Sequence, residues 1–171
     1  MKPEDQARVV IDELLRHAGW EVQDRSQMSL FGSPGRGVAV REAMLASGPA
    51  DYLLFVGGKA LGVIEAKKFG MTLSGVEDQS GRYAQGLKQP MRAWLPDHPL
   101  PFRYESTGVE TYFTNILDPE PRSRRVFAFH HPETLAAWAG EPATLRGRLQ
   151  QMPPLIGRDL WPPQISAIYG L

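Results

Sequence analysis

The chain has 171 residues, of which 42% are hydrophobic, and it contains no cysteine. The length predicts one domain with a short tail, and the lack of cysteine excludes a disulfide framework and a zinc–thiolate site. With 19 basic and 19 acidic residues the formal net charge is zero, so the chain lacks the basic excess of a typical stand-alone DNA-binding protein. No apolar run approaches the roughly 20 residues of a membrane-spanning helix and no secretory signal is recognisable, so we expect a cytoplasmic protein without membrane contact.

An amphipathic helix is predicted over residues 4–18. Apolar side chains recur there at the spacing of one helix face, and Gly19 is a typical stop signal. The first strand of a sheet is expected at residues 20–22. Alternating side chains over residues 38–42 predict a second strand, which ends at Glu42.

Residues 51–67 contain two apolar, strand-like runs on either side of Gly57-Gly58-Lys59, which is a pattern typical of a β-hairpin. A three-residue loop would place Asp51 opposite Glu65, and Lys67 would project from the same face as Glu65. A two-residue loop would shift the register by one residue and turn Asp51 to the opposite face. The prediction of a shared site therefore depends on the length of this loop.

Asp51, Glu65 and Lys67 would then meet at one end of an apolar ribbon, where charged groups are costly unless they are paired or hold a metal. Two converging carboxylates suit Mg²⁺, because this ion prefers oxygen ligands. A lysine beside the metal can orient or deprotonate a water molecule and stabilise phosphate charge in the transition state. These residue types favour metal-assisted hydrolysis of a phosphodiester. The alternative is an ordinary acid–lysine ion pair on a solvated hairpin end.

A capping-box pattern at residues 74–77 predicts the start of another helix. Gln79 and Tyr83 are four residues apart and would lie on one face of that helix. Residues 90–101 are rich in proline and predict an extended linker. The remaining expected elements are strands at 102–105, 109–114 and 126–130, and short helices at 132–139 and 145–150.

The densest basic cluster consists of Arg122, Arg124 and Arg125. Such a cluster suits either a contact with the DNA backbone or an ordinary solvated surface, and the sequence does not decide between them.

Pro49-Ala50-Asp51, followed by Glu65-Ala66-Lys67 at the end of the next strand, resembles the nuclease motif P-D…(D/E)-x-K. The pair Gln79 and Tyr83 follows at the spacing of the Gln-x-x-x-Tyr motif, so the combination resembles the RecB-like branch of these nucleases. The flanking residues 48–68 and 105–115 resemble the N-terminal endonuclease domain of the restriction (R) subunit of type I restriction enzymes. This resemblance covers nearly the whole chain. Its one departure is Ala50, which separates the proline from the aspartate.

The resemblance implies an α/β fold with a restriction-endonuclease-like core, in which helices flank a central mixed sheet. It also implies that Mg²⁺ (or Mn²⁺) is bound by Asp51, Glu65 and the backbone carbonyl of Ala66, and that Lys67 orients the attacking water. Gln79 and Tyr83 would support the site and the DNA.

In RecB-like nucleases a carboxylate of the first helix often reaches the metal. Glu13 is the candidate for that role on the predicted helix, and Glu42 is a second candidate for an additional carboxylate. In both cases the alternative is a solvated glutamate without a role in the site.

The domain expected from the resemblance covers residues 1–150, and residues 151–171 would be a linker and the start of a truncated helicase-like motor. ATP binding and translocation would then lie downstream of this chain. The expected partners are double-stranded DNA and the methyltransferase and specificity subunits of the restriction complex. The alternatives are a non-catalytic docking module of that complex and another RecB-like nuclease, such as a repair enzyme.

Overall fold

The structure of the chain is a computed structural model that describes residues 3–27, 29, 36–45, 48–73, 92–95, 98–153 and 155–169. Gln79 and Tyr83, with the helix predicted around them, lie outside the described residues.

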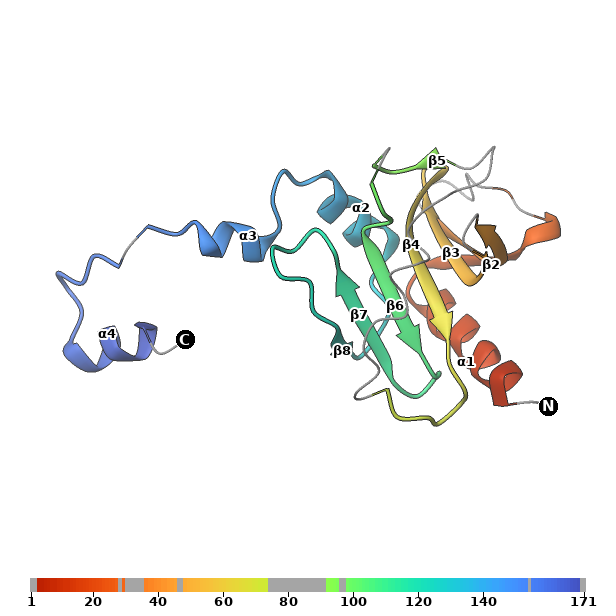
Figure 1. Cartoon of the computed structure of the whole chain (residues 1–171), viewed down its shortest axis with the longest axis horizontal. Helices are drawn as coiled ribbons and strands as arrows, with labels where there is room; N and C mark the ends of the chain where they lie inside the picture. Colours follow the sequence, from red (N-terminus) through yellow and green to blue (C-terminus); the bar gives the residue numbers. More distant parts are fainter. Residues whose placement is uncertain are drawn as a thin grey trace.

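In the described part of the chain an eight-stranded sheet forms the centre of the molecule (Figure 1), with the strand order β1-β2-β3-β4-β6-β7-β8 and β5 paired to β4. The pairs β1/β2, β4/β5 and β4/β6 are parallel and the others are antiparallel. The predicted α/β class with a mixed sheet flanked by helices is therefore confirmed. The strands are β1 (Trp20–Asp24), β2 (Gly37–Leu45), β3 (Gly48–Val56), β4 (Lys59–Ala66), β5 (Arg92–Ala93), β6 (Phe102–Ser106), β7 (Thr111–Asn115) and β8 (Arg124–Val126).

Two apolar layers hold the sheet. On one face, α1 (Pro3–His17) and α2 (Pro132–Gly140) pack against β3, β4 and β6, and this layer contains buried Ile11, Tyr52 and Leu135. A second layer on the other face includes Leu53 and Phe55. Because β3 and β4 are buried on both faces, they read in the sequence as nearly continuous apolar runs.

The hairpin loop between β3 and β4 has two residues, which is the loop length expected to turn Asp51 to the opposite face. Gly57 and Gly58 have φ angles of 55° and 76°, the positive values that tight hairpin turns require at both central positions. The register nevertheless does not slip. Phe55 pairs with Ala60 but Leu54 pairs with Gly62, so Leu61 is the extra residue of a β-bulge.

The bulge compensates for the shorter loop. Beyond it, Tyr52 pairs with Ile64, which is the register that the three-residue loop was expected to produce. The strands therefore still bring Asp51 toward the end of β4 that carries Glu65.

The later elements differ from expectation in two places. Within the proline-rich segment, β5 pairs in parallel with the start of β4, and Trp94 N donates to Ala60 O at 2.7 Å. The last strand, β8, ends at Val126 instead of starting there, because it pairs only with Thr111, Tyr112 and Phe113 of β7.

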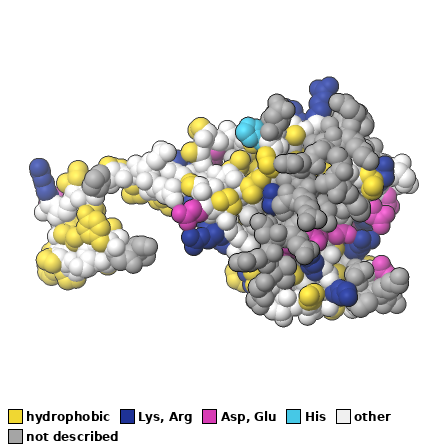
Figure 2. Space-filling model, in the orientation of Figure 1, with side chains coloured by type: hydrophobic (Ala, Val, Ile, Leu, Met, Phe, Trp, Pro, Cys, Tyr) yellow, Lys and Arg dark blue, Asp and Glu magenta, His cyan; other side chains and the backbone are white. Residues whose placement is uncertain are grey.

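The C-terminal arm, which we define as residues 145–169, leaves the body beside α2 and extends away from the sheet (Figure 1). It contains α3 (Leu145–Gln150) and α4 (Pro162–Tyr169). Its apolar side chains are visible along α4 in Figure 2, and several are exposed, among them Leu149, Ile156 and Trp161.

Candidate active site

The hairpin site, which we define as Asp51, Glu65, Ala66 and Lys67, lies where β3 begins and β4 ends. One carboxylate oxygen of Asp51, Oδ2, accepts a hydrogen bond from the backbone N–H of Ala66 at 2.9 Å. The other, Oδ1, lies 2.5 Å from Nη2 of Arg8 on α1. Asp51 is thus tied directly to the strand segment that carries the other predicted residues.

Glu65 and Lys67 contact one another on one side of β4. Lys67 Nζ lies 2.5 Å from Glu65 Oε1, and both side chains are about one-fifth exposed (21% and 19%). The second oxygen, Glu65 Oε2, is buried and has no hydrogen-bond partner in the described part of the chain. A buried polar atom without a partner costs free energy, so this oxygen marks a position where a ligand would be stabilising.

The backbone at the end of β4 is fixed on both sides. Lys67 N donates to Ser106 O of β6 at 2.8 Å, while Ala66 N donates to Asp51. The structure therefore brings Asp51, Ala66, Glu65 and Lys67 to one end of adjacent strands, as the sequence predicted.

Arg8 joins the hairpin site to Glu42. Its Nη1 lies 3.1 Å from Glu42 Oε1, and its Nη2 contacts Asp51. Burial lowers the pKa of Arg8, but the hydrogen bond to Asp51 and the charges of Asp51 and Glu42 outweigh it, so the pKa is raised. Glu42 has a φ angle of 50°, which is uncommon for a residue other than glycine and interrupts the alternation of β2.

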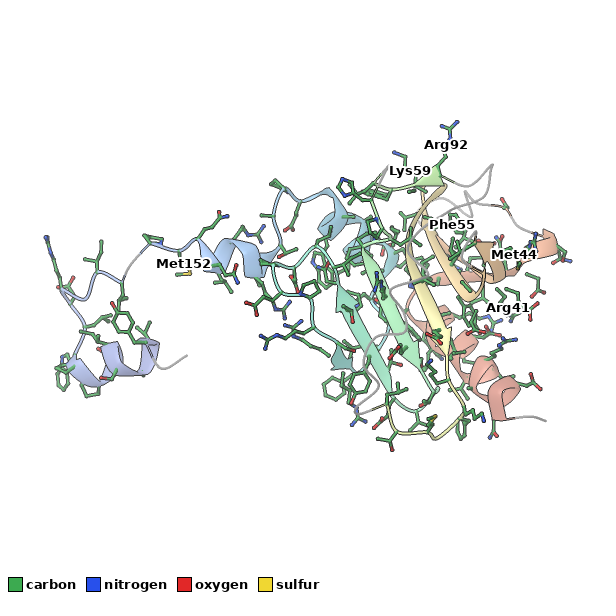
Figure 3. The ribbon with its side chains drawn as sticks, viewed as in Figure 1. Arg41, Met44, Phe55, Lys59, Arg92 and Met152 are labelled. Atoms are coloured by element: carbon green, nitrogen blue, oxygen red, sulfur yellow. The ribbon has the colours of Figure 1, made fainter. Side chains whose placement is uncertain are left out.

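A polar network between α1 and the sheet was missed by sequence reasoning. Buried Asp12 binds Arg41 of β2 through two hydrogen bonds and accepts a third from the Tyr52 hydroxyl at 2.9 Å. Hydrogen bonding to Asp12 raises the pKa of Arg41, and burial with the charge of Asp12 raises the pKa of Tyr52. Figure 3 labels Arg41 at this side of the sheet. The sequence feature that could have revealed this network is Asp12, a charged residue one turn after Arg8 that lies within the apolar face of the helix.

The two candidates for an additional carboxylate are placed differently. Glu13 is exposed on α1, whereas its neighbour Asp12 faces the sheet. Glu42 lines a cavity of about 440 Å³ together with Arg8, Arg25 and Asp51. A third carboxylate, Glu105 of β6, pairs in register with Glu65, and no sequence pattern had singled it out.

The oxygen atoms of the hairpin site fit a hard divalent cation. Two carboxylates and a backbone carbonyl are the ligand types that Mg²⁺ accepts while it keeps several waters. Glu65 Oε2 also lacks a hydrogen-bond partner within the described residues. Within the described ranges, no group of three or more His, Cys, Asp or Glu side chains is placed to hold a metal. Two basic side chains already pair with these carboxylates, Arg8 with Asp51 and Lys67 with Glu65. A metal ion would therefore compete with Arg8 for Asp51.

Comparison with known families decides what kind of protein carries this site. A family model described as type I restriction enzyme EcoKI endonuclease subunit, second domain, matches residues 25–112, just over half of the chain.

The chain belongs to this family.

The matched residues of this type I restriction family include Asp51, Glu65 and Lys67, whereas α1 precedes them and α2 and the arm follow them. A curated relative, the type I restriction enzyme EcoKI endonuclease subunit of Escherichia coli (strain K12), is 33% identical over 131 residues. These residues are 71% of this chain but 11% of the relative, so the chain spans a small part of its length. No solved structure matches the chain.

The expected resemblance to the endonuclease subunit of type I restriction enzymes is therefore confirmed at the level of the subunit. None of the helices in the described part is long and apolar enough to cross a membrane.

Proposed function

We propose that this chain is the DNA-cleaving domain of a type I restriction enzyme subunit and hydrolyses phosphodiester bonds with the help of a divalent cation. One observation carries the proposal: Asp51 is hydrogen-bonded to Ala66, between Glu65 and Lys67, inside the segment that matches the family. We assign the fold to the restriction-endonuclease-like class and the residues to the P-D…(D/E)-x-K motif on the same grounds.

Asp51, Glu65 and the carbonyl of Ala66 would hold Mg²⁺ or Mn²⁺. When bound, the cation supplies Lewis-acid stabilisation of charge on the phosphate. Lys67, which contacts Glu65, orients the attacking water and stabilises the negative charge of the transition state. We keep Gln79 and Tyr83 as residues that support the site and the DNA.

Arg8 has a distinct role in this proposal. Its contact with Asp51 neutralises the carboxylate before the cation binds, and its second contact, with Glu42, holds the guanidinium close by afterwards. Asp51 would thus have a positive partner both with and without a bound cation, which would lower the cost of an acidic site between packed strands.

In the complete subunit we place the domain in residues 1–150, with 151–171 leading into a downstream ATP-driven motor. The substrate is double-stranded DNA, and the partners are the methyltransferase and specificity subunits. These assignments follow from the family, whose curated relative is much longer than this chain.

The test uses the full-length subunit, assembled with its partners, and compares DNA cleavage with ATP hydrolysis. Asp51→Asn, Glu65→Gln and Lys67→Gln should each abolish cleavage and leave ATP hydrolysis unchanged, and Glu13→Gln is the matched control because Glu13 is exposed on α1. Normal cleavage by Glu65→Gln would contradict the proposal. If all three variants cut normally, the chain is a docking module instead.

A further inference from the structure

A second candidate site lies at the edge of the sheet formed by β7 and β8, away from the β3–β4 hairpin. A cavity of about 450 Å³ opens between the strands β7 and β8 and the helices α2 and α3, and we call it the arginine cavity. All of its lining residues follow residue 112, so none belongs to the segment that matches the family. A cavity of this size is within the range of about 300–1,000 Å³ that holds small-molecule ligands.

One wall of the arginine cavity is aromatic. The ring of His130 lies 4.5 Å from the ring of Phe113 and 4.9 Å from that of Trp138, measured between centroids. Tyr104 fixes the imidazole through a contact of 2.6 Å between its hydroxyl and Nδ1. Burial lowers the pKa of His130, so this ring is neutral at pH 7. The wall is therefore an uncharged aromatic surface in which the His130 ring is tilted by 57° against Phe113 and by 62° against Trp138. A nucleic acid base can stack on a ring face of such a surface.

Another part of the lining is basic. Four guanidinium groups, from Arg124, Arg125, Arg146 and Arg148, line the cavity together with two carboxylates, from Asp118 and Glu141. A third carboxylate, Glu110 outside the lining, lies 3.5 Å from Arg125. The cavity therefore has an excess of positive charge, although the whole chain is neutral. In Figure 2, dark blue side chains gather where the arm leaves the body.

A buried carboxylate positions two of these arginines. The Asp118 side chain is 2% exposed, and its Oδ2 accepts a hydrogen bond from Arg146 Nη1 at 2.9 Å while Arg124 Nη1 lies 3.7 Å away. The two guanidinium groups are 50% and 38% exposed, so they stand between the carboxylate and solvent. Each guanidinium has five N–H groups, and one carboxylate oxygen leaves most of them available for an anion.

We propose that the arginine cavity binds a nucleotide unit, with its base on the Phe113–His130–Trp138 wall and its phosphate on the arginines. The same chemistry occurs in a free nucleotide and in a single strand of DNA. The arginine cavity and the hairpin site lie at opposite ends of β6. Asn115, which lines the cavity, pairs with Phe102 at the start of that strand, whereas Ser106, which accepts a hydrogen bond from Lys67 N, lies at its end. The proposal therefore does not depend on the hairpin site.

The test measures binding by the 171-residue chain in EDTA at low salt, where no metal-dependent cleavage occurs. The probes are deoxyadenosine monophosphate, followed by quenching of tryptophan fluorescence, and a short fluorescein-labelled single-stranded oligonucleotide, followed by anisotropy. Tighter binding of the oligonucleotide assigns the site to a DNA strand, and equal affinity for both probes assigns it to a free nucleotide.

The decisive variant is Arg125→Gln/Arg148→Gln, because neither arginine bonds to buried Asp118 and the fold should therefore persist. Its charge-matched control is Arg122→Gln/Arg158→Gln, two exposed arginines outside the cavity. We expect at least a roughly fivefold weaker affinity for the cavity variant and no change for the control. Trp138→Phe should remove the quenching. The proposal is wrong if neither probe binds the wild-type chain, or if both double variants lose affinity equally.

Discussion

The hairpin site and the arginine cavity arrange their acidic and basic side chains in opposite ways, although the chain as a whole is neutral. In the hairpin site the acids are fixed by the strands and each has a basic partner, while one oxygen of Glu65 has no hydrogen-bond partner among the residues that the structure describes. In the arginine cavity the acid that holds two arginines, Asp118, is buried, and the basic groups face solvent. The first arrangement suits a cation and the second suits an anion. A net charge of zero therefore says little about nucleic acid binding when opposite charges are gathered at separate sites.

The largest expected effects come from removing the charges of one site and measuring the properties of both, which tests whether the two sites are independent. Asp51→Asn/Glu65→Gln should abolish cleavage by the assembled enzyme and leave oligonucleotide binding in EDTA unchanged. Arg125→Gln/Arg148→Gln should weaken oligonucleotide binding and leave Mg²⁺ affinity unchanged. A cleavage assay, anisotropy with the oligonucleotide and calorimetry with Mg²⁺ check these statements. If either variant loses both its oligonucleotide binding and its hairpin-site property, the two sites are one.

A smaller effect is expected from the network beneath the hairpin site. Asp12→Ala leaves Arg41 and the Tyr52 hydroxyl without their buried acceptor, so the free energy of unfolding should fall by about 1–3 kcal/mol. Urea denaturation measures this loss. Asp24→Ala is the control, because Asp24 also pairs with Arg41 but is 59% exposed, and its removal should cost less than about 1 kcal/mol. Equal losses in the two variants would show that burial of Asp12 contributes nothing.

Arg8 should weaken cation binding because it shares Asp51. Replacing it in Arg8→Gln removes a competing charge, so Mg²⁺ should bind about two- to fivefold more tightly, a small change because the arginine is 37% exposed. Titration calorimetry checks the direction. Arg16→Gln, on the same helix and exposed, is the control. Weaker binding in Arg8→Gln would show that the arginine helps the cation instead of competing with it.

The smallest effect concerns pH and the arginine cavity. Because burial lowers the pKa of His130, the unfolded chain binds this proton more readily than the folded chain does. Stability from the neutral ring is complete above the unfolded pKa of about 6.5 and declines as pH falls below it. Thermal unfolding of His130→Gln should depend less on pH between about 5 and 7 than that of the wild type. His131→Gln, which changes the exposed neighbour, is the control.

Much of the fold follows from local pattern. Helical spacing of apolar residues predicted α1, proline at the first turn predicted α2, and α3 was expected at the residues where it occurs. The sequence left the loop length open, since Gly57-Gly58-Lys59 is compatible with two or three loop residues. The bulge at Leu61 was not anticipated, because nothing in an apolar run marks which residue is left unpaired.

The two sites differ in how far the sequence could predict them. Asp51, Glu65 and Lys67 lie within or directly after one hairpin, so the pairing of two neighbouring strands, with the bulge at Leu61, brings them together. The arginine cavity requires Phe113 of β7, Trp138 of α2 and Arg146 of α3 to meet, and no pattern within the sequence places two short helices against a strand. Sequence reasoning identified Arg124 and Arg125 as a basic cluster but did not predict the aromatic wall beside them.

We expect the hairpin site to bind a divalent cation, and calorimetric titration of Mg²⁺ into the chain is the direct test. Wild type is compared with Asp51→Asn/Glu65→Gln, with a short uncleavable DNA duplex present to supply phosphate oxygens. Binding should occur in the wild type and disappear in the double variant, while circular dichroism shows that the fold is retained. Indistinguishable titrations of the two proteins would show that Asp51 and Glu65 do not hold the cation.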